Sequence, residues 1–549
     1  MGNAAIYFHP DAFDTSASRL LGRHSAGESF LRGLVRHGAY DRLHLYNVIG
    51  TDQGRLERLL QRIEPPSRPV RWIGATGRSE LEDPGVLHMP TPAMPDEAWR
   101  RLAHGVRRYA ISGLTHTTAS ANVMGILPNF LVAPLEDYDA LICTSTAVRA
   151  AVDTQIAMMR EYMGQEYGPR RRPEAQRVTI PLGVNCADFT TTPEHRRAWR
   201  ERLDIPEDAV VALFVGRFHV KAKMNPALMA MALERAAART GRTIYWVNSG
   251  WAENDEALAI YHAETRKLCP SVEYREVDGR PPDVRFSIWS VADFFISFSD
   301  NIQESFGLTP VEAMAAGLPS VVSDWDGYKD TVRDGEDGFR IPTLAPRAGY
   351  GGDLAYFYNN GWLTYDNYIG ATGQNTAVDL GRAEAAVVSL VTDEDLRRRM
   401  GAEAQAHARR TFDWSAIIPQ YEALWGEQNA RRRAAPPAAP QANPFTPDPF
   451  TLFENYPTRN IGADDIVSLA PGMTWEAANA RLSAPLASYS RFNRPTSLEL
   501  EAVWKRLAEG GPASVAALRE LVVMSRRNVV ERGLIWLARH DVVEIRPAS

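Results

Sequence analysis

The first 425 residues of the chain alternate between two hydrophobic patterns. Short, continuous apolar runs predict buried strands, and apolar positions repeated every three or four residues, as in 27–37, predict amphipathic helices. The first strands are expected at 4–8, 43–49, 140–143 and 178–180. Strands that alternate with helices in this way are typical of a parallel sheet with helices on both faces.

A second alternating unit begins near residue 209. Strands are expected at 209–215, 243–247 and 291–298, with a helix over 226–238 after the first of them. The predicted fold class is α/β, with two Rossmann-like, doubly wound domains in tandem. Because ligands bind such sheets at the carboxyl ends of their strands, we expect the site in a cleft between the two domains.

The composition changes after residue 430. Residues 431–460 are rich in proline and alanine and are typical of a linker. After it, three apolar helical faces and a final strand over 542–545 resemble a winged helix, a small and mostly helical domain. The predicted boundaries are 1–195 and 196–411 for the Rossmann-like domains, 412–430 for a final helix, 431–460 for the linker and 461–549 for the winged-helix-like interaction domain.

The string Glu304-Ser-Phe-Gly-Leu-Thr-Pro-Val-Glu312 follows the apolar run 291–298. We expect the strand to deliver Glu304 at its carboxyl end, Gly307 to form a turn, and a helix to open at Thr309 and Pro310. Free backbone N–H groups at a helix start favour a phosphate, and the two carboxylates can accept hydrogen bonds from hydroxyls on either side of it. The string therefore predicts a site for a sugar attached to a phosphate.

The same residues resemble a known family. Glu304 and Glu312 stand at the spacing of the E-x7-E motif of retaining, family 4-like glycosyltransferases, and 335–339 (Gly-Glu-Asp-Gly-Phe) also looks like that family. The resemblance covers about Ala4 to Trp425. It implies the GT-B fold, a final helix that returns to the first domain, a UDP- or GDP-type sugar donor bound mainly by the second domain, and an acceptor bound mainly by the first.

The resemblance also implies roles for individual residues. Arg217 and Lys223 would stabilise the departing nucleoside diphosphate, with Lys221 left open as an alternative to Lys223. His116, which follows an apolar segment, would face the transferred sugar together with Glu304. In front-face transfer of a hexose, these two side chains position the sugar, and the leaving phosphate takes the acceptor's proton. The residues implied in donor binding are Gly27, which we expect just before the first helix, Gly216, Phe306, Gly307, Leu308, Thr309 and Glu312.

We expect no metal and no further cofactor. Asp324-Trp-Asp326 resembles the Asp-x-Asp of another glycosyltransferase class, but two carboxylates alone make a poor metal cage, and cationic side chains already fill the positive role. A loop that faces the acceptor is the preferred interpretation. The sequence also has no G-x-S-x-G, H-E-x-x-H or P-loop string, which argues against a serine hydrolase, a zincin or a Walker ATPase.

Composition and charge narrow the partners. At 549 residues the chain suggests two to four domains, and its net charge of −6 argues against a general polyanion binder. Three widely spaced cysteines, Cys143, Cys186 and Cys269, fit core thiols in a reducing compartment. No leader-like start and no long apolar segment are present, so we expect a cytoplasmic protein, with peripheral membrane contact left open.

Two segments leave alternatives open. Residues 344–374, rich in glycine and aromatic residues, are expected to form an irregular insertion that either stacks on sugar rings or packs as a surface loop. The nearly balanced charges of 499–546 favour a protein partner or a homodimer over DNA. The acceptor is open between a glycan, a lipid-linked molecule and a protein. The alternative functions are a sugar-nucleotide epimerase or phosphorylase of the same fold, and a sugar-nucleotide sensor acting through the winged-helix-like domain.

Overall fold

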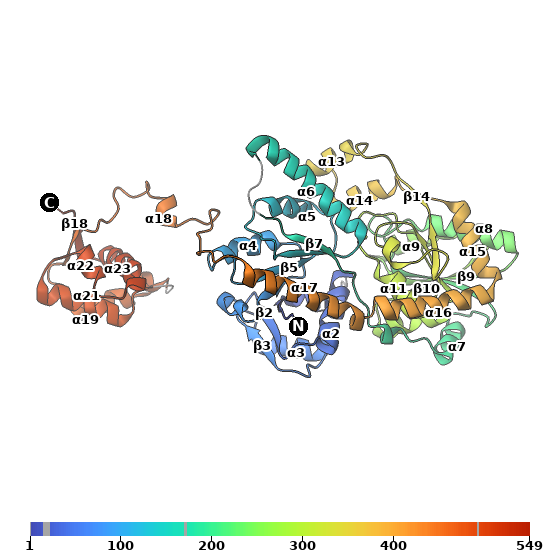
Figure 1. Cartoon of the computed structure of the whole chain (residues 1–549), viewed down its shortest axis with the longest axis horizontal. Helices are drawn as coiled ribbons and strands as arrows, with labels where there is room; N and C mark the ends of the chain where they lie inside the picture. Colours follow the sequence, from blue (N-terminus) through green and yellow to red (C-terminus); the bar gives the residue numbers. More distant parts are fainter. Residues whose placement is uncertain (1, 15–21, 169–172, 491–493, 549) are drawn as a thin grey trace. The chain divides into compact units, whose positions relative to one another are not determined.

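A computed structural model describes residues 2–14, 22–168, 173–490 and 494–548 (Figure 1). The chain forms two compact units, Met1–Asn443 and Pro444–Ser549. The first unit contains two parallel sheets, and the second contains a small antiparallel sheet with helices. The two units are described separately below.

The first sheet has seven parallel strands in the order β3-β2-β1-β4-β5-β6-β7. Its strands are β1 Ala5–Phe8, β2 Leu43–Asn47, β3 Val70–Ile73, β4 Val86–His88, β5 Ala110–Leu114, β6 Ala140–Cys143 and β7 Gln176–Thr179. The helices associated with it are α1 Pro10–Phe13, α2 Gly22–His37, α3 Gln53–Ile63, α4 Met94–Leu102, α5 Ala121–Ile126 and α6 Thr146–Tyr167, and α7 Pro193–Arg202 follows.

The second sheet has six parallel strands in the order β10-β9-β8-β11-β12-β13. Its strands are β8 Val210–Arg217, β9 Ile244–Trp251, β10 Glu273–Asp278, β11 Phe294–Ser297, β12 Ser320–Ser323 and β13 Gly338–Ile341. Its helices are α8 Ala227–Thr240, α9 Asp255–Leu268, α10 Pro282–Ser287, α11 Leu308–Ala315, α12 Tyr328–Thr331, α15 Leu380–Thr392 and α16 Glu394–Thr411. The strand order reverses between β1 and β4 and between β8 and β11, which confirms the prediction of two doubly wound sheets.

The hydrophobic pattern explains these elements. Every residue of β5 and of β6 is buried, as expected for central strands covered on both faces. Helix α3 buries one apolar stripe, Leu56, Leu59, Leu60 and Ile63, and Asp52 caps its first turn by accepting from the Arg55 N–H. The three cysteines are buried and unpaired, as predicted.

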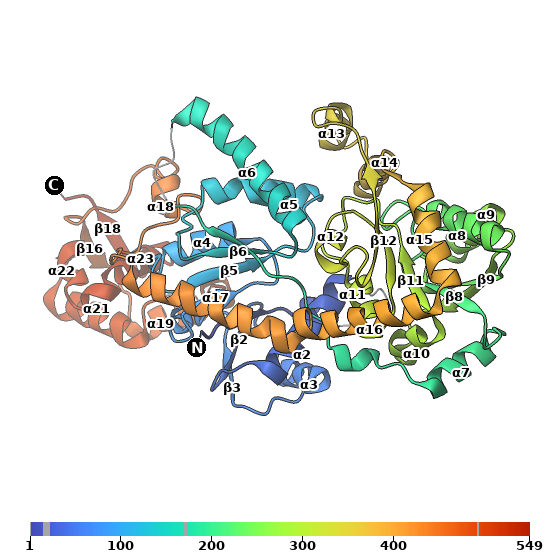
Figure 2. The same cartoon turned by 45° about the vertical axis from the view of Figure 1, so that its right-hand side comes forward.

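Helix α17 (Trp414–Ala434) returns from the second sheet and packs on α2, β4 and β5 of the first, as both ribbon views show (Figure 2). The chain passes twice between the half of the first unit that contains the first sheet and the half that contains the second. The two crossing segments lie side by side: the Val184 N–H donates to the Phe412 carbonyl (2.8 Å), and the Trp414 N–H donates to the Val184 carbonyl (3.1 Å). Two Rossmann-like sheets with a returning helix are the GT-B fold that the resemblance implies.

The region between β14 (Thr343–Leu344) and β15 (Ala377–Val378) is not irregular, which corrects the sequence-based expectation. It contains two helices, α13 (Gly352–Asn359) and α14 (Tyr365–Gly373). Residues 435–460 are largely without regular structure apart from the single turn α18 (Pro449–Leu452), whereas the start of the predicted linker belongs to α17.

The second unit has a three-stranded antiparallel sheet in the order β17-β16-β18. Its elements are β16 Ile466–Leu469, α19 Trp475–Ser483, α20 Pro485–Ser488, α21 Ser497–Gly510, β17 Ala513–Ser514, α22 Val515–Arg519, α23 Arg527–Arg539 and β18 Val543–Arg546. The second predicted helix is shorter than its apolar pattern suggested, and β16 and α19 were not foreseen. The winged-helix resemblance of this unit stays a prediction.

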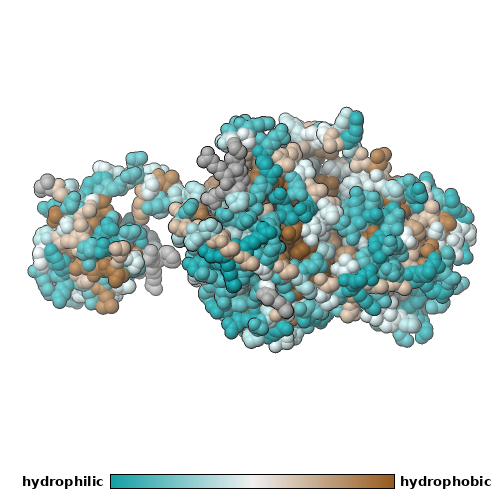
Figure 3. Space-filling model, viewed as in Figure 1, coloured by the Kyte–Doolittle hydropathy of each residue, from teal (hydrophilic) through white to brown (hydrophobic). Residues whose placement is uncertain are grey.

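The face of the molecule in Figure 3 is mostly hydrophilic, and hydrophobic residues appear there in small, separate patches. Across residues 2–14, 22–168, 173–490 and 494–548, no helix is both long and apolar enough to cross a membrane.

Trp414 fixes the returning helix, and its loss tests this packing. Its buried indole donates to the Ser29 hydroxyl (2.7 Å), and a Cβ added at Gly33 or Gly183 would lie 2.4 or 2.5 Å from the ring. We expect Trp414→Ala to lower the free energy of unfolding by about 3–5 kcal/mol because it leaves a large cavity. Urea unfolding measures this, with Trp362→Ala, at an exposed tryptophan of the same unit, as the control. Equal stability of the two variants would contradict the packing.

Candidate functional site

The loop 298–307 between β11 and α11 carries the first acid of the motif. Strand β11 ends at Ser297, so Glu304 lies well inside the loop and not at the end of the strand, which corrects the sequence-based expectation. Helix α11 starts at Leu308, one residue before the predicted Thr309. The loop follows the carboxyl end of β11, beside the point where the strand order reverses. Doubly wound sheets bind their ligands at such points.

Gly307 forms the predicted turn, in a conformation that requires glycine. Its φ is 83°, in the left-handed region, and a Cβ at this position would lie 2.1 Å from Cε1 of Tyr328. The buried Tyr328 hydroxyl is itself fixed by a 2.8 Å hydrogen bond with the Ser297 hydroxyl. The backbone can therefore turn over the tyrosine ring and enter α11 only when residue 307 has no side chain.

The same loop brings Lys223 to Glu304. The Asn301 amide donates to the Lys221 carbonyl, and the Gln303 amide donates to the Ala222 carbonyl (2.9 Å). These bonds hold the segment after β8 against the loop, and the Lys223 ammonium lies 3.4 Å from Oε2 of Glu304. The side chains of Lys223 and Glu304 are 31% and 16% exposed, so solvent screens this ion pair only in part.

Lys221, the alternative cation, has a different partner. Its side chain is exposed, and its ammonium donates to Oδ1 of Asn367 in α14 at 2.8 Å. The geometry therefore favours Lys223 over Lys221 as the lysine beside Glu304.

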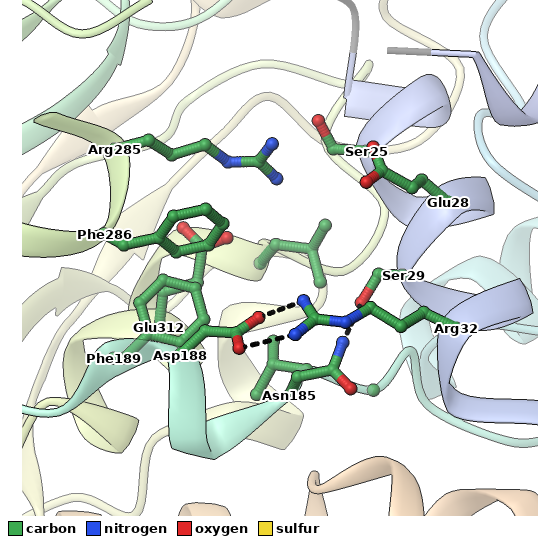
Figure 4. Close-up of a pocket in the computed structure, with 13 residues that line it drawn as sticks. Ser25, Glu28, Ser29, Arg32, Asn185, Asp188, Phe189, Arg285, Phe286 and Glu312 are labelled. Carbon is green, nitrogen blue, oxygen red and sulfur yellow. Dashed lines mark hydrogen bonds and ion pairs between the residues drawn. The ribbon is translucent and has the colours of Figure 1, made fainter. Parts of the chain in front are cut away.

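Glu312 lies in a pocket between the two halves of the first unit (Figure 4). Burial raises the pKa of its carboxyl group, while the positive charges of Arg285 and Lys223 oppose that rise. The positive charge of Lys223 therefore interacts with both acids of the motif, Glu304 and Glu312. Figure 4 labels the following lining residues together with Glu312: Ser25, Glu28, Ser29, Arg32, Asn185, Asp188, Phe189, Arg285 and Phe286.

The walls of this pocket are well ordered by side-chain contacts. Arg32 of α2 binds both carboxylate oxygens of Asp188, one of them at 2.8 Å, and the rings of Phe189 and Phe286 meet edge to face at 5.6 Å. Arg285 points across the pocket towards Ser25 of α2 (Figure 4). A pocket with carboxylates, a guanidinium group and an aromatic wall can accept hydroxyl groups and hold a flat ring system.

Sequence reasoning missed most of this pocket. Arg285 and Phe286 lie on α10, between β10 and β11, and Arg32 and Asp188 come from two other segments. No motif joins these positions along the chain. The only usable signal was that α10 follows β10 at the carboxyl edge of the sheet.

Gly27 lies inside α2 and not before it, so the expectation of a glycine at the start of the first helix is wrong. A Cβ at Gly27 would lie 2.0 Å from the carbonyl oxygen of Ala12. The glycine therefore allows α1 to pack closely on α2, and a part in donor binding stays a prediction.

His116 follows β5 at the carboxyl edge of the first sheet. Its backbone carbonyl accepts a 2.5 Å hydrogen bond from the hydroxyl of Ser305, the neighbour of Glu304. The residue also borders an apolar cavity that it shares with Gly27 and Trp414. The structure thus brings the backbone of His116 to the motif loop, and the role of its imidazole stays a prediction.

The other residues predicted for the donor occupy different positions. Arg217 ends β8, and Gly216 lies opposite Gly250 in the register of β8 and β9. Leu308 lines the Glu312 pocket, and Thr309 is hydrogen-bonded to Tyr328. The Phe306 ring is buried against Phe412 at 6.0 Å, so its side chain is a core contact and cannot touch a donor.

The Asp-x-Asp loop after β12 faces the first sheet's half. The Ser145 hydroxyl donates to Asp326 (3.3 Å), and Asp330 accepts from the N–H and the hydroxyl of Thr146, at 2.6 and 2.7 Å. Burial and the charge of Glu304 raise the pKa of Asp326 to about 7. The Asp324 carboxylate instead pairs with Arg340, with Oδ1 3.5 Å from Nη1 of the guanidinium. Within the part of the chain that the structure describes, no three His, Cys, Asp or Glu side chains form a group that could hold a metal ion.

Comparisons with known proteins show which sequences and structures this chain resembles. Residues 195–348 match the family model of glycosyl transferases group 1, and this segment contains Arg217, Lys223 and both motif glutamates. The D-inositol 3-phosphate glycosyltransferase of Corynebacterium diphtheriae is 29% identical over 259 residues, which are 46% of this chain and 51% of that protein. The protein of the same name from Streptomyces griseus is 30% identical over 265 residues, covering 46% and 48%. The chain spans about half the length of the curated relatives it matches.

Solved structures with a similar chain path include HepE of Anabaena in complex with UDP, with 15% identity, a TM-score of 0.49, and 78% of this chain and 100% of that chain covered. Sucrose-phosphate synthase from Thermosynechococcus elongatus has 15% identity and a TM-score of 0.47, and the match covers 78% of this chain and 100% of that chain.

Asp300, in the motif loop, provides a pH-dependent test of the site's burial. Burial raises the pKa of its carboxyl group to about 7, whereas an unfolded aspartate titrates near pH 4. Between these values the folded state binds a proton that the unfolded state has released, so stability falls as pH rises, by up to about 4 kcal/mol.

We expect Asp300→Asn to remove this dependence, so that the variant is more stable than wild type at pH 8 and the difference shrinks towards pH 4. Urea unfolding at several pH values measures it, with Asp137→Asn, at an exposed position, as the control. Parallel stability curves for Asp300→Asn and wild type between pH 4 and 8 would show that this carboxyl group is not desolvated.

Proposed function

We propose, from the glycosyl transferases group 1 domain at residues 195–348, that this protein transfers a sugar from a nucleotide-sugar donor of UDP or GDP type to an acceptor hydroxyl. One observation carries the proposal: the same cation, Lys223, is close to both acids of the motif. Its ammonium lies 3.4 Å from the Glu304 carboxylate, and its charge opposes the rise in the pKa of Glu312, which lies in the helix that follows the glycine turn. The two acids lie on either side of the place where the diphosphate would bind.

The donor would extend along this arrangement. Its nucleoside would occupy the pocket between α2 and α10, where Glu312 would accept from ribose hydroxyls and Phe286 would contact the base. Its diphosphate would meet the free N–H groups at the start of α11, and Lys223 and Arg217 would neutralise its charge. Glu304 would then accept hydrogen bonds from hydroxyls of the sugar.

The transfer step requires charge stabilisation and little else from the protein. The bond between the anomeric carbon and the diphosphate oxygen breaks, and negative charge builds up on the leaving group, where Lys223 and Arg217 act. The acceptor oxygen bonds to the same face of the anomeric carbon, and its proton passes to the leaving phosphate. The configuration is retained, and neither a metal nor a protein nucleophile takes part in this proposal.

The relatives give one indication of the acceptor. Their names specify D-inositol 3-phosphate, and this chain spans about half of their length. We therefore extend to this protein only the transfer of a glycosyl group, and not that acceptor.

Nucleotide binding tests the donor site directly. We expect saturating UDP or GDP to raise the melting temperature, since a ligand at 100 times its Kd stabilises the native state by about 2.7 kcal/mol. Glu312→Gln should lose most of this shift, because it removes the negative charge that accepts from the ribose. Glu264→Gln, at an exposed site on α9, is the matched control. Absence of a shift with UDP, GDP and ADP alike would contradict the proposal.

Glu304→Gln tests the transfer step. We expect UDP- or GDP-sugar turnover, measured as nucleotide release, to fall by roughly 100-fold or more while the circular dichroism spectrum stays unchanged. The substitution keeps the shape of the side chain and removes the charge that faces Lys223. Wild-type turnover by this variant, with Glu264→Gln measured in parallel, would exclude Glu304 from the reaction.

A further inference from the structure

The insertion between β14 and β15 carries an exposed aromatic surface. Tyr356, Phe357 and Trp362 are 56%, 36% and 67% exposed and contact one another. The Phe357 and Trp362 rings stack at 5.5 Å with an angle of 27°, and Tyr356 meets their edges at 6.0 and 5.7 Å. We call these three residues the aromatic platform. Rings of this size are normally buried, so a contiguous exposed group of them indicates a binding surface.

The turn after α13 holds the platform in shape. Gly361 adopts a φ of 72°, and the backbone N–H of Trp362 then donates to the Phe357 carbonyl at 2.9 Å. Asn360 caps the same helix end through its side-chain amide, which donates to the Tyr356 carbonyl (2.8 Å). Since the backbone around all three rings is fixed, a ligand would lose little free energy in ordering them.

The insertion joins the platform to the candidate site. Tyr358, next to Phe357, stacks on Tyr368 of α14 at 4.2 Å, and its hydroxyl accepts from the backbone N–H of Ala121 in the first half of the unit. Ile369 of α14 packs with Ala119, three residues after His116, and with Ala222, which precedes Lys223. Figure 2 shows α13 at the tip of the insertion, beyond α14. The platform therefore lies on an element whose base contacts both halves of the site.

Charge selects among the molecules that an aromatic surface could hold. The insertion, residues 345–376, contains no lysine, two aspartates, Asp353 and Asp366, and one arginine, Arg347, whose guanidinium lies over the Tyr350 ring at 4.8 Å. Anionic membranes and nucleic acids need several cationic side chains at their contacts, and the insertion has only Arg347. The polar residues next to the platform in the sequence are the neutral Asn359, Asn360 and Thr364, and α13 also carries one acid, Asp353. Neutral sugars match this chemistry, because they present C–H faces to rings and hydroxyls to amides.

We propose that the aromatic platform is an acceptor subsite that binds a neutral saccharide of two or more units, so that the acceptor of this enzyme is a glycan. This inference rests on the proposed function. A sugar unit stacks on Trp362 and Phe357, and the rest of the glycan extends past Tyr358 and α14 towards Glu304. The family match ends at residue 348, and α13 and α14 follow that boundary, so the subsite is assigned from the residues of this chain.

A glycan microarray with the full-length, fluorescently labelled protein and saturating UDP tests the subsite. We expect binding to neutral oligosaccharides built from glucose, galactose, mannose or N-acetylglucosamine. Trp362→Ala should weaken this binding about ten-fold, because it removes a stacking contact worth roughly 1.4 kcal/mol. Trp362→Phe, which keeps an aromatic face, should retain most of the signal. Tyr162→Ala, at an exposed tyrosine of α6, is the matched control.

The possible results separate the two proposals. If wild type shows no thermal shift with UDP or GDP, the proposed function fails. If the shift is present but no neutral glycan binds, or Trp362→Ala binds as wild type does, the saccharide subsite is wrong. Binding to phosphatidylglycerol vesicles that is lost in Trp362→Ala would identify a membrane surface instead, and a concentration-dependent dimer that is lost in the same variant would identify a second copy of the chain. Either result would overturn the subsite.

Discussion

The site depends on a backbone constraint at one residue. Gly307 must be glycine, because its φ of 83° and the 2.1 Å approach of the Tyr328 ring leave no room for a side chain. The turn at Gly307 sets the direction in which α11 leaves the loop, with Glu304 on the Lys223 side and Glu312 in the pocket opposite α2. Tyr328 and Ser297 hold the other side of the turn. A change at any of these positions would therefore alter both acids together.

Much of the fold could be predicted from the chain because its strands are continuous apolar runs. The bounds of β6, Ala140–Cys143, match the expectation, and both sheets have the parallel, doubly wound order that strand–helix alternation indicates. The insertion was harder, since glycine and aromatic residues are typical of loops. Helix α14 nevertheless packs on both halves of the site through Ile369, and α13 is joined to α14 by the stacking of Tyr358 on Tyr368. Helix α2 was expected to begin at Gly27 and includes residues before it, because a polar first turn gives no hydrophobic signal.

The candidate site divides in the same way. Glu304, Gly307 and Glu312 could be found from one contiguous string. Lys223 came only from the resemblance, with Lys221 left open, because the hydrogen bonds that hold the segment after β8 against the loop join residues about eighty positions apart. Arg32, Asp188, Arg285 and Phe286 could not be found, since three distant segments meet only in the folded chain. Gly27 was expected just before the first helix but lies inside α2, where the absence of a side chain makes room for the backbone of α1. Asp300 and Asp326 acquire their raised pKa values from burial, which a sequence does not display.

The central claim is that a nucleoside diphosphate binds across the start of α11. A crystal structure of the protein with UDP or GDP at saturating concentration tests it most directly. The account predicts ribose hydroxyls within hydrogen-bonding distance of Glu312 and phosphate oxygens at the N–H groups of Leu308 and Thr309, with Lys223 beside them. A nucleotide bound elsewhere on the chain, with the pocket between α2 and α10 left unoccupied by it, would contradict the account.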